Sequence, residues 1–311
     1  MLAAVVLAVL TPRWGASGGS LHLARVTQLG VGAVFFLHGA GLSIERLRSG
    51  AGNWRLHLFV QSATFLVFPL VGLSIEYLGA GLLPKPLRDG LFYLCALNST
   101  VASSIALTAV AGGDVAAAVF NATLSSLIGM LATPLWVDFG LHAAGRGFGF
   151  DRQLLGIGRQ LLLPFVGGLL THRWLGATAA RHRRAVGGFD RAVIILIVYG
   201  AFCDATQGGL WRTHALALLA QATAAISLLL ALALGLTTWA ARRVGFPLRV
   251  EVVAVFCGSK KSLAVGVPMA RLLFAPAQLG MMLLPLMLYH QLQLLVCALL
   301  AQRYARRLRD T

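Results

Sequence analysis

The stretch CGSKKSLAVGVP, residues 257–268, places two adjacent lysines inside a run of apolar and small residues. The nearest basic residues on either side, Arg249 and Arg271, each lie 11 residues from Lys260. At a rise of about 1.5 Å per residue this is roughly 16 Å of helix, and a lysine side chain reaches only about 6 Å. Neither ammonium group can therefore extend to the end of its apolar segment, so each needs a partner inside the membrane.

The composition identifies a polytopic membrane protein. Of 311 residues, 58% are hydrophobic and 12% are charged, and a soluble domain carries about twice that charged fraction. The net charge of +16 does not indicate nucleic-acid binding, because the basic residues lie in short gaps between apolar runs. Only 3 of the 26 basic residues are lysines, and two of these form the central pair. The 4 cysteines lie in apolar runs and are expected to be core residues, with no metal and no cofactor.

Ten apolar segments alternate with short polar gaps. About 20 residues cross a bilayer, so the first segment is too short to span it alone. The gaps at one side of the membrane hold 15 basic residues and those at the other side hold 9, which puts both termini in the cytoplasm. The segments are residues 2–12, 26–44, 56–80, 91–111, 114–141, 158–176, 190–209, 214–240, 250–273 and 277–302.

The longest gap divides these segments into two sets of five. This predicts a first repeat at 1–141, a connecting segment at 142–157, a second repeat at 158–303 and a cytoplasmic tail at 304–311. An odd number of spans in each half inverts the second half relative to the first, which is the geometry of many secondary transporters.

The fourth segment of each half is interrupted by small and polar residues. The first contains LNSTVASSIALTAVAGGD (97–114) and the second contains FCGSKKSLAVGVPMA (256–270). Interruptions at corresponding positions of two halves are typical of a transport site, although such hydroxyls also bond to their own helix. Asp114 is expected to cap the segment that follows.

The predicted substrate or ion site gathers polar residues from these interruptions and from neighbouring segments. Carbonyl ends and hydroxyls of broken helices stabilise a cation, and a lysine ammonium can supply one. Because neighbours on a helix diverge by about 100°, we expect one lysine to fill this position while the other faces the substrate path. Repulsion and burial of two adjacent ammonium groups favour proton exchange at one of them, and the sequence does not say which lysine has which role. A purely structural ammonium and ordinary helix–helix hydrogen bonds are the alternatives. The candidates are Lys260, Lys261, Ser259, Asn98, Thr100, Ser103, Ser104, Asn121, Thr123, His290 and Gln291.

The lysine motif, FCGSKKSLAVGVPMA, closely resembles a signature of the bile acid:sodium symporter superfamily, in its YfeH-like branch that includes the seventh member of solute carrier family 10. Five more stretches resemble the same branch, and the resemblance covers nearly the whole chain in order. They are FFLHGAGLSIERLRSG (35–50), WRLHLFVQSATFLVFPLVGL (54–73), AGGDVAAAVFNATLSSLIG (111–129), LLLPFVGGLL (161–170) and GMMLLPLMLYHQLQLLVCALLAQRY (280–304).

The resemblance implies a ten-helix fold of two inverted repeats in the inner (plasma) membrane of a bacterium. Helices 1, 2, 6 and 7 would form a panel domain, and helices 3–5 and 8–10 a core domain in which broken helices 4 and 9 cross. Sodium-coupled relatives bind two sodium ions at this crossover with the help of a glutamate, and that position is Phe256 here. The presence of phenylalanine in place of this glutamate disfavours sodium coupling.

The leading interpretation is therefore a secondary transporter, not an enzyme, that moves a small organic solute by alternating access. An anionic solute and proton coupling are favoured over sodium. A membrane regulator of ion homeostasis and a sodium-coupled symporter remain alternatives. A retinal-type protein is disfavoured, because it would have seven spans and a carboxylate counter-ion beside one lysine. The oligomeric state does not follow from these patterns.

Overall fold

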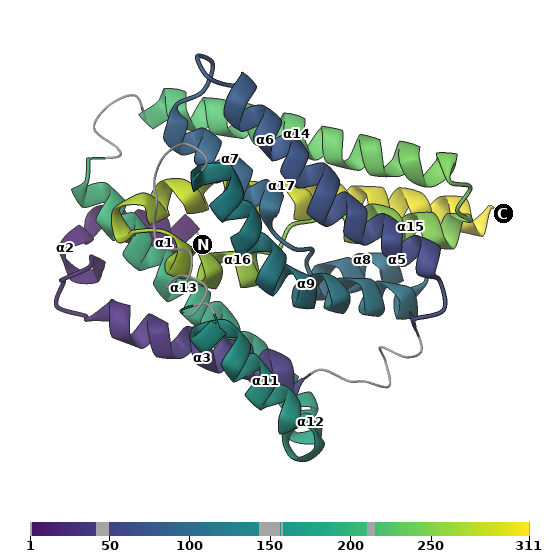
Figure 1. Cartoon of the computed structure of the whole chain (residues 1–311), viewed down its shortest axis with the longest axis horizontal. Helices are drawn as coiled ribbons and strands as arrows, with labels where there is room; N and C mark the ends of the chain where they lie inside the picture. Colours follow the sequence, from purple (N-terminus) through teal and green to yellow (C-terminus); the bar gives the residue numbers. More distant parts are fainter. Residues whose placement is uncertain (1, 42–49, 143–155, 157, 210–214, 311) are drawn as a thin grey trace. The chain divides into compact units, whose positions relative to one another are not determined.

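The computed structural model describes residues 2–41, 50–142, 156, 158–209 and 215–310, and these form helices and no β-strand. The predicted connecting segment 142–157 lies outside the described residues except at 142 and 156. The helices are α1 (Leu2–Leu10), α2 (Pro12–Gly15), α3 (Leu23–Ala40), α5 (Trp54–Ser62), η1 (Ala63–Val67), α6 (Phe68–Leu78), α7 (Lys85–Ala96), α8 (Ala102–Val110), α9 (Val115–His142), η2 (Gly158–Leu162), α11 (Leu163–Leu170), α12 (His172–Arg181), α13 (Arg183–Gln207), α14 (Ala215–Arg243), α15 (Leu248–Ser259), α16 (Leu263–Leu273) and α17 (Pro276–Arg309) (Figure 1).

Within the described residues, six helical stretches are long and apolar enough to cross a membrane, and each coincides with a predicted segment. The predicted segments at 91–111 and 250–273 are absent from this set because each is divided into two shorter helices. The all-helical, polytopic class is thus confirmed. The six stretches are Leu23–Ala40, Trp54–Leu78, Val115–Leu141, Arg184–Gln207, Leu216–Arg243 and Pro276–Arg309.

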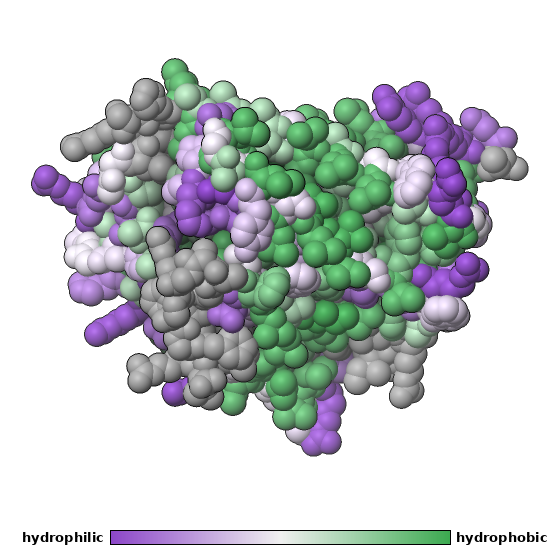
Figure 2. All heavy atoms as spheres, turned by 45° about the horizontal axis from the view of Figure 1, so that its top comes forward, coloured by the Kyte–Doolittle hydropathy of each residue, from purple (hydrophilic) through white to green (hydrophobic). Residues whose placement is uncertain are grey.

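The surface carries large apolar side chains that a water-soluble protein would bury. Figure 2 shows a broad hydrophobic surface in green, with hydrophilic side chains toward its edges, including the right-hand end, where α14 and α17 end in Figure 1. Leu228 and Leu163, for example, are 73% and 70% exposed. Side chains of this kind are suited to contact with lipid, and the helical backbone satisfies its own polar groups.

The chain divides into two compact units. The first contains Met1–Ser43, His142–Leu218 and Gly266–Leu283. In it α3 packs against α11, where Gly39 lies against the backbone of Phe165 and Gly168 lies against the backbone of Phe36. A side chain at either glycine would collide with the facing helix, so small residues permit this close approach.

The second unit contains Ile44–Leu141, Leu219–Val265 and Leu284–Thr311. Here α15 packs against α5 and α8, and α6 packs against α7 (Figure 1). Asp114 accepts a hydrogen bond from the N–H of Ala117 at 3.0 Å, so the predicted cap of α9 is confirmed. All polar contacts of the lysine pair that are described below lie within this unit.

Candidate functional site

The second unit contains two breaks in its helices, which we call the first break (residues 97–101, between α7 and α8) and the second break (residues 260–262, between α15 and α16). The interruptions predicted for the fourth segment of each half are therefore confirmed. The two breaks also touch, because the N–H of Ser262 donates to the carbonyl of Asn98 at 2.9 Å.

The Lys261 side chain is 2% exposed and its ammonium is surrounded by backbone carbonyls. Its Nζ atom donates to the carbonyls of Leu97 at 2.7 Å, Cys95 at 2.8 Å and Thr64 at 3.3 Å. It also lies 4.8 Å from the centre of the Phe68 ring. An ammonium group has three donors, and three acceptors satisfy all of them here.

The local folding of the chain explains why these carbonyls are available. The final carbonyls of a helix have no partner in that helix and form the negative end of its dipole. Since α7 ends at Ala96, the carbonyls of Cys95 and Leu97 lie at such an end. Thr64 belongs to the π-helical turn η1, a type of turn that is frequent at functional sites. The site therefore resembles a cation site in which the cation is attached to the chain.

Two side chains of α17 hold the second break in place. Gln293 accepts from the N–H of Lys261 and donates to its carbonyl, both at 2.9 Å. The hydroxyl of Tyr289 donates to the carbonyl of Ser259 at 2.8 Å. These bonds replace helical hydrogen bonds that the break removes. Tyr289 was not among the predicted site residues, although its spacing of one helical turn from Gln293 puts the two on one face.

Lys260 begins a chain of hydroxyl groups. Its Nζ atom donates to Ser103 at 2.7 Å, and Ser103 donates to Thr100 at 2.9 Å. Thr100 and Ser104 are 2.7 Å apart, and Ser104 donates to the carbonyl of Phe256 at 3.1 Å. Each hydroxyl thus accepts one hydrogen bond and donates the next, so the chain leads from the ammonium to a backbone carbonyl.

The backbone of the second break corrects one detail of the prediction. The divergence of the two lysines was inferred from helical geometry, but Lys260 has extended backbone angles, with φ −90° and ψ 146°. Successive side chains of an extended chain point to opposite sides. This is why Lys261 reaches the end of α7 while Lys260 reaches the first turn of α8.

The first break is also bonded to α9. The N–H of Ser99 donates to the hydroxyl of Ser125 at 3.0 Å, and the amide of Asn98 donates to Ser126 at 3.1 Å. Both Asn98 and Ser99 are fully buried, yet the Oδ1 atom of Asn98 and the hydroxyl of Ser99 have no hydrogen-bond partner among the described residues. Such unpaired polar atoms cost about 1–3 kcal/mol each unless water or a ligand pairs with them.

Other predicted site residues lie in different surroundings. The Ser259 hydroxyl donates to the carbonyl of Val255 in its own helix at 2.6 Å. The Asn121 amide donates to the carbonyl of Ala117 in its own helix at 2.9 Å, and the Gln61 amide donates to the carbonyl of Asn121 at 3.2 Å. These bonds do not include either lysine.

The predicted residues of segment ten and Thr123 differ in burial. His290 pairs with Gln293 at 3.0 Å and is linked through it to the second break. Gln291 is exposed on the same helix, whereas Gln293 is fully buried. Thr123 is buried on α9, with no hydrogen bond to the lysine pair among the described residues. Of these two glutamines of α17, Gln293 is therefore the one that contacts the second break.

The family resemblance matches Phe256 to a glutamate of sodium-coupled relatives. The Phe256 side chain is fully buried and packs edge-on against Tyr304, with ring centres 6.1 Å apart. It belongs to an apolar cluster with Val252 and Cys297. The Phe256 side chain thus offers packed hydrocarbon and no oxygen ligand to a sodium ion. The carboxylate of Glu251, to which Tyr304 donates, is already paired with Arg242.

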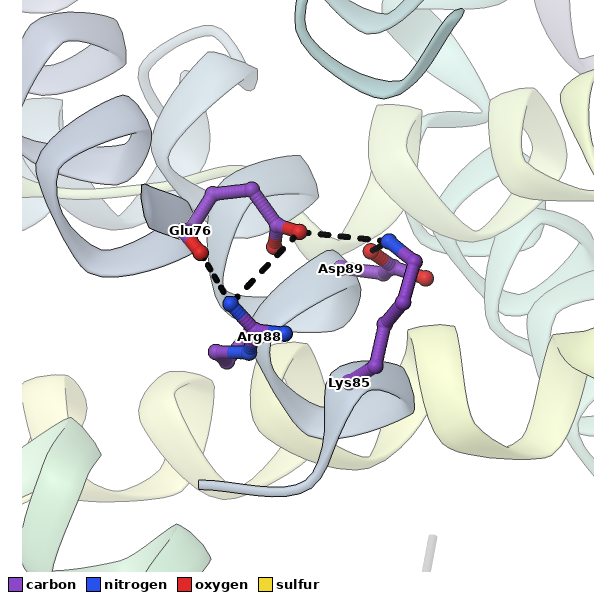
Figure 3. Close-up of polar contacts among 4 residues, drawn as sticks. All are labelled: Glu76, Lys85, Arg88 and Asp89. Atoms are coloured by element: carbon purple, nitrogen blue, oxygen red, sulfur yellow. Dashed lines mark hydrogen bonds and ion pairs between the residues drawn. The ribbon is translucent and has the colours of Figure 1, made fainter. Parts of the chain in front are cut away.

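An ion cluster fixes the other end of α7. Figure 3 shows Glu76 at the end of α6 facing Lys85 and Arg88 of α7. Lys85 lies 3.2 Å from the Glu76 carboxylate and 2.7 Å from that of Asp89, and Arg88 donates to the backbone carbonyl of Glu76. Because Glu76 is only 7% exposed, these contacts hold α7 on α6. The helix that supplies two of the carbonyls around Lys261 is therefore anchored at both ends.

Comparisons with known proteins agree with this membrane architecture. The model of the SBF-like CPA transporter family matches residues 1–306. A protein of Pseudomonas aeruginosa, PA2026, is 46% identical over 310 residues, which cover 100% of this chain and 92% of that protein. The YfeH protein of Escherichia coli strain K12, whose name includes the word symporter, is 43% identical over 91% of this chain and 85% of its own. Sodium/bile acid cotransporter 7 of Danio rerio is 29% identical over 95% of this chain and 89% of its own.

Proposed function

This chain belongs to the SBF-like CPA transporter family, and we propose that it is a secondary transporter of a small organic anion that works without sodium. It is a multi-pass membrane transporter rather than an enzyme, as the family and its symporter-named relative indicate. The substrate class, the coupling and the site residues are our proposals.

The proposed architecture has ten membrane helices in two inverted repeats, 1–141 and 158–303. The two breaks lie at corresponding places, each in the fourth predicted segment of its half. This correspondence supports the division into two repeats. The division into two compact units supports a panel domain built mainly from the predicted segments 1, 2, 6 and 7, which lie in the first unit. It supports a core domain built mainly from the predicted segments 3–5 and 8–10, which lie largely in the second unit. In the proposed orientation both termini lie in the cytoplasm of a bacterium.

The observation that carries the proposal is the environment of Lys261. Broken helices of transporters coordinate sodium through unwound carbonyls and helix C-terminal ends. Lys261 meets three carbonyls, and the two at the end of α7 lie at distances typical of charge-assisted hydrogen bonds. A bound sodium ion at this point would compete with an ammonium that the chain already supplies. We propose that Lys261 is this tethered cation and that it stabilises the site permanently.

Lys260 has a different proposed role. Its Nζ atom has one hydrogen-bond partner among the described residues, Ser103, so two of its three donors are available for a ligand. We assign to it the binding of an anionic group of the substrate and the exchange of a proton during the transport cycle. The unpaired buried atoms of Asn98 and Ser99 supply polar contacts to the same substrate. An anion fits because the charge of Lys260 has no carboxylate partner within hydrogen-bond distance in the described residues.

A sodium-coupled symporter is the second candidate, because the vertebrate relatives are named sodium/bile acid cotransporters. The packed side chain of Phe256 opposes this candidate. It fills the position of the coordinating glutamate with hydrocarbon. A regulator of ion homeostasis that transports nothing has no specific contact in its favour.

A thermal-shift and uptake experiment distinguishes these functions. Purified protein is screened with a panel of small carboxylates, sulfonates and organic phosphates, in sodium chloride and in choline chloride. We expect at least one anion to raise the melting temperature equally in both salts, and the same anion to enter proteoliposomes. Stabilisation and uptake that require sodium would establish the symporter instead. Failure of every anion, alongside uptake of neutral or cationic solutes, would refute the anion assignment.

A further inference from the structure

A groove separate from the lysine pair lies between α14 and α17. Its volume is about 680 Å³. Its walls are largely apolar, and Trp239 and Leu299 on its sides are each 57% exposed. Gly235 lines the groove, and no atom lies within 4 Å of the place where a side chain at this position would begin. Both helices are membrane spans, so the groove faces the region where lipid chains lie.

Three arginines line the same groove near the C-terminal ends of the two helices. They are Arg242 and Arg243 of α14 and Arg303 of α17. Arg242 is bonded to the buried carboxylate of Glu251, with 3.1 Å between Nε and Oε1. Within the described part of the chain, Arg243 and Arg303 have no carboxylate partner. Two exposed guanidinium groups therefore face the groove with their charge uncompensated.

We propose that this groove binds an anionic diacyl phospholipid. The phosphate would lie between Arg243 and Arg303, because guanidinium groups bind phosphate oxygens through paired N–H donors. One acyl chain would follow the apolar wall, past Leu234 and Leu299, toward the middle of the membrane. Basic pockets between membrane helices recognise lipid headgroups by this combination of charge and hydrocarbon.

The shape of the groove favours a lipid over a free anion. A soluble anion would use only the arginine end and would leave the apolar wall unoccupied. Trp239 supports the assignment, since tryptophan is enriched at the level of the lipid headgroups. The guanidinium carbon of Arg243 lies 5.5 Å from the Trp239 ring centre, which orients the arginine over the groove.

Lipid titration of the purified protein tests the proposal. Binding is followed by native mass spectrometry and by the melting temperature, with phosphatidylglycerol, phosphatidylcholine of the same acyl chains, and glycerol phosphate as the probes. We expect selective binding of phosphatidylglycerol to the wild-type protein. The double variant Arg243→Ala, Arg303→Ala should weaken this binding about 30-fold, or roughly fivefold for each arginine, without changing the binding of phosphatidylcholine. The matched control, Arg306→Ala with Arg309→Ala, removes two exposed arginines of the same helix that do not line the groove.

A steric variant separates the groove from a general effect of charge. Gly235→Leu adds a side chain at a residue that lines the groove and retains every arginine. Leucine also has a higher helix propensity than glycine. This variant should lose phosphatidylglycerol selectivity while melting at or above the wild-type temperature in detergent. The proposal would be overturned if the wild-type protein bound the two lipids equally or if the two double variants had equal effects on binding. It would also be overturned if glycerol phosphate alone raised the melting temperature as much as phosphatidylglycerol does. Unchanged lipid selectivity in Gly235→Leu would overturn it as well.

Discussion

The side chain of Gln293 bonds to both backbone groups of Lys261, accepting from its N–H and donating to its carbonyl at 2.9 Å. The same residue is therefore held twice, by Gln293 at its backbone and by three carbonyls at its ammonium. A break in a buried helix would otherwise leave these groups unpaired. The position of the ammonium is thus specified by the fold and does not depend on an exposed, mobile side chain.

Gln293→Leu should destabilise the protein by about 2–4 kcal/mol, because it leaves the N–H and the carbonyl of Lys261 unpaired in a buried place. The exposed neighbour on the same helix supplies the control, since Gln291→Leu removes no described contact of the site and should change stability by less than about 0.5 kcal/mol. Unfolding in a mixed-micelle denaturation series measures both. Equal stability losses would show that Gln293 does not hold the break.

The two lysines should differ in their effect on stability. Lys261→Ala leaves three carbonyls unpaired, at about 1–3 kcal/mol each, whereas Lys260→Ala removes one hydrogen bond, worth about 1 kcal/mol. Lys261→Gln should recover part of the loss because it keeps two donors. Lys261→Arg should fail because a planar guanidinium is too large for the cage of carbonyls. Melting curves of the four variants provide the test, and a Lys260→Ala protein less stable than Lys261→Ala would reverse the assignment.

Transport should depend on Lys260 and its hydroxyl chain more than folding does. Lys260→Gln should keep a melting temperature close to that of the wild type and lose most uptake of the anion found in the screen. Ser103→Ala leaves the buried Lys260 ammonium without its described partner, so it should lose uptake and also about 1–3 kcal/mol of stability. Ser74→Ala is the matched control, because the Ser74 hydroxyl bonds only to the carbonyl of Leu70 in its own helix. Uptake by the Lys260→Gln protein at the wild-type rate would exclude Lys260 from the substrate path.

Residue types were sufficient to predict where the helices break. Small and polar residues at 98–104 and in the Gly258–Lys261 stretch stand out in apolar segments. The observed breaks overlap both stretches, although residues 102–104 already belong to α8 and Gly258 and Ser259 still belong to α15. The buried position of Lys260 and Lys261 followed from their distance to the next basic residues. These predictions succeeded because a charge or a helix-weakening residue within a membrane segment has few acceptable environments.

The partners of the lysines could not be predicted in the same way. Lys261 bonds to backbone carbonyls, and every residue has one, so no residue type marks Thr64, Cys95 or Leu97 as a ligand. The separate directions of the two lysines depend on the extended backbone at Lys260, which a helical model of the segment did not contain. Which of Gln291 and Gln293 points into the protein depends on the rotation of α17 about its axis. The sequence does not indicate this rotation, because apolar residues occur on every face of the helix.

The membrane orientation gives a prediction that is independent of the site. The proposed orientation, with both termini in the cytoplasm, predicts that the turn between α6 and α7 lies outside and that the end of α17 lies inside. A cysteine at the exposed position Leu82 should react with an impermeant maleimide in intact cells, and one at Arg306 should react only after permeabilisation. The four native cysteines are buried and should give little background. The opposite labelling pattern would invert the topology.

The melting temperature in sodium chloride and in choline chloride, measured for the wild-type protein and for Lys261→Ala at one pH and one ionic strength, tests the tethered cation most directly. The wild-type protein should melt at the same temperature in both salts, because the ammonium of Lys261 already occupies the carbonyl cage. Lys261→Ala should melt at a lower temperature in choline chloride and should recover part of the loss in sodium chloride, where a free cation can enter the vacated cage. A wild-type melting temperature that rises with sodium, or a Lys261→Ala protein that matches the wild type in choline chloride, would contradict the assignment of Lys261 as the cation of this site.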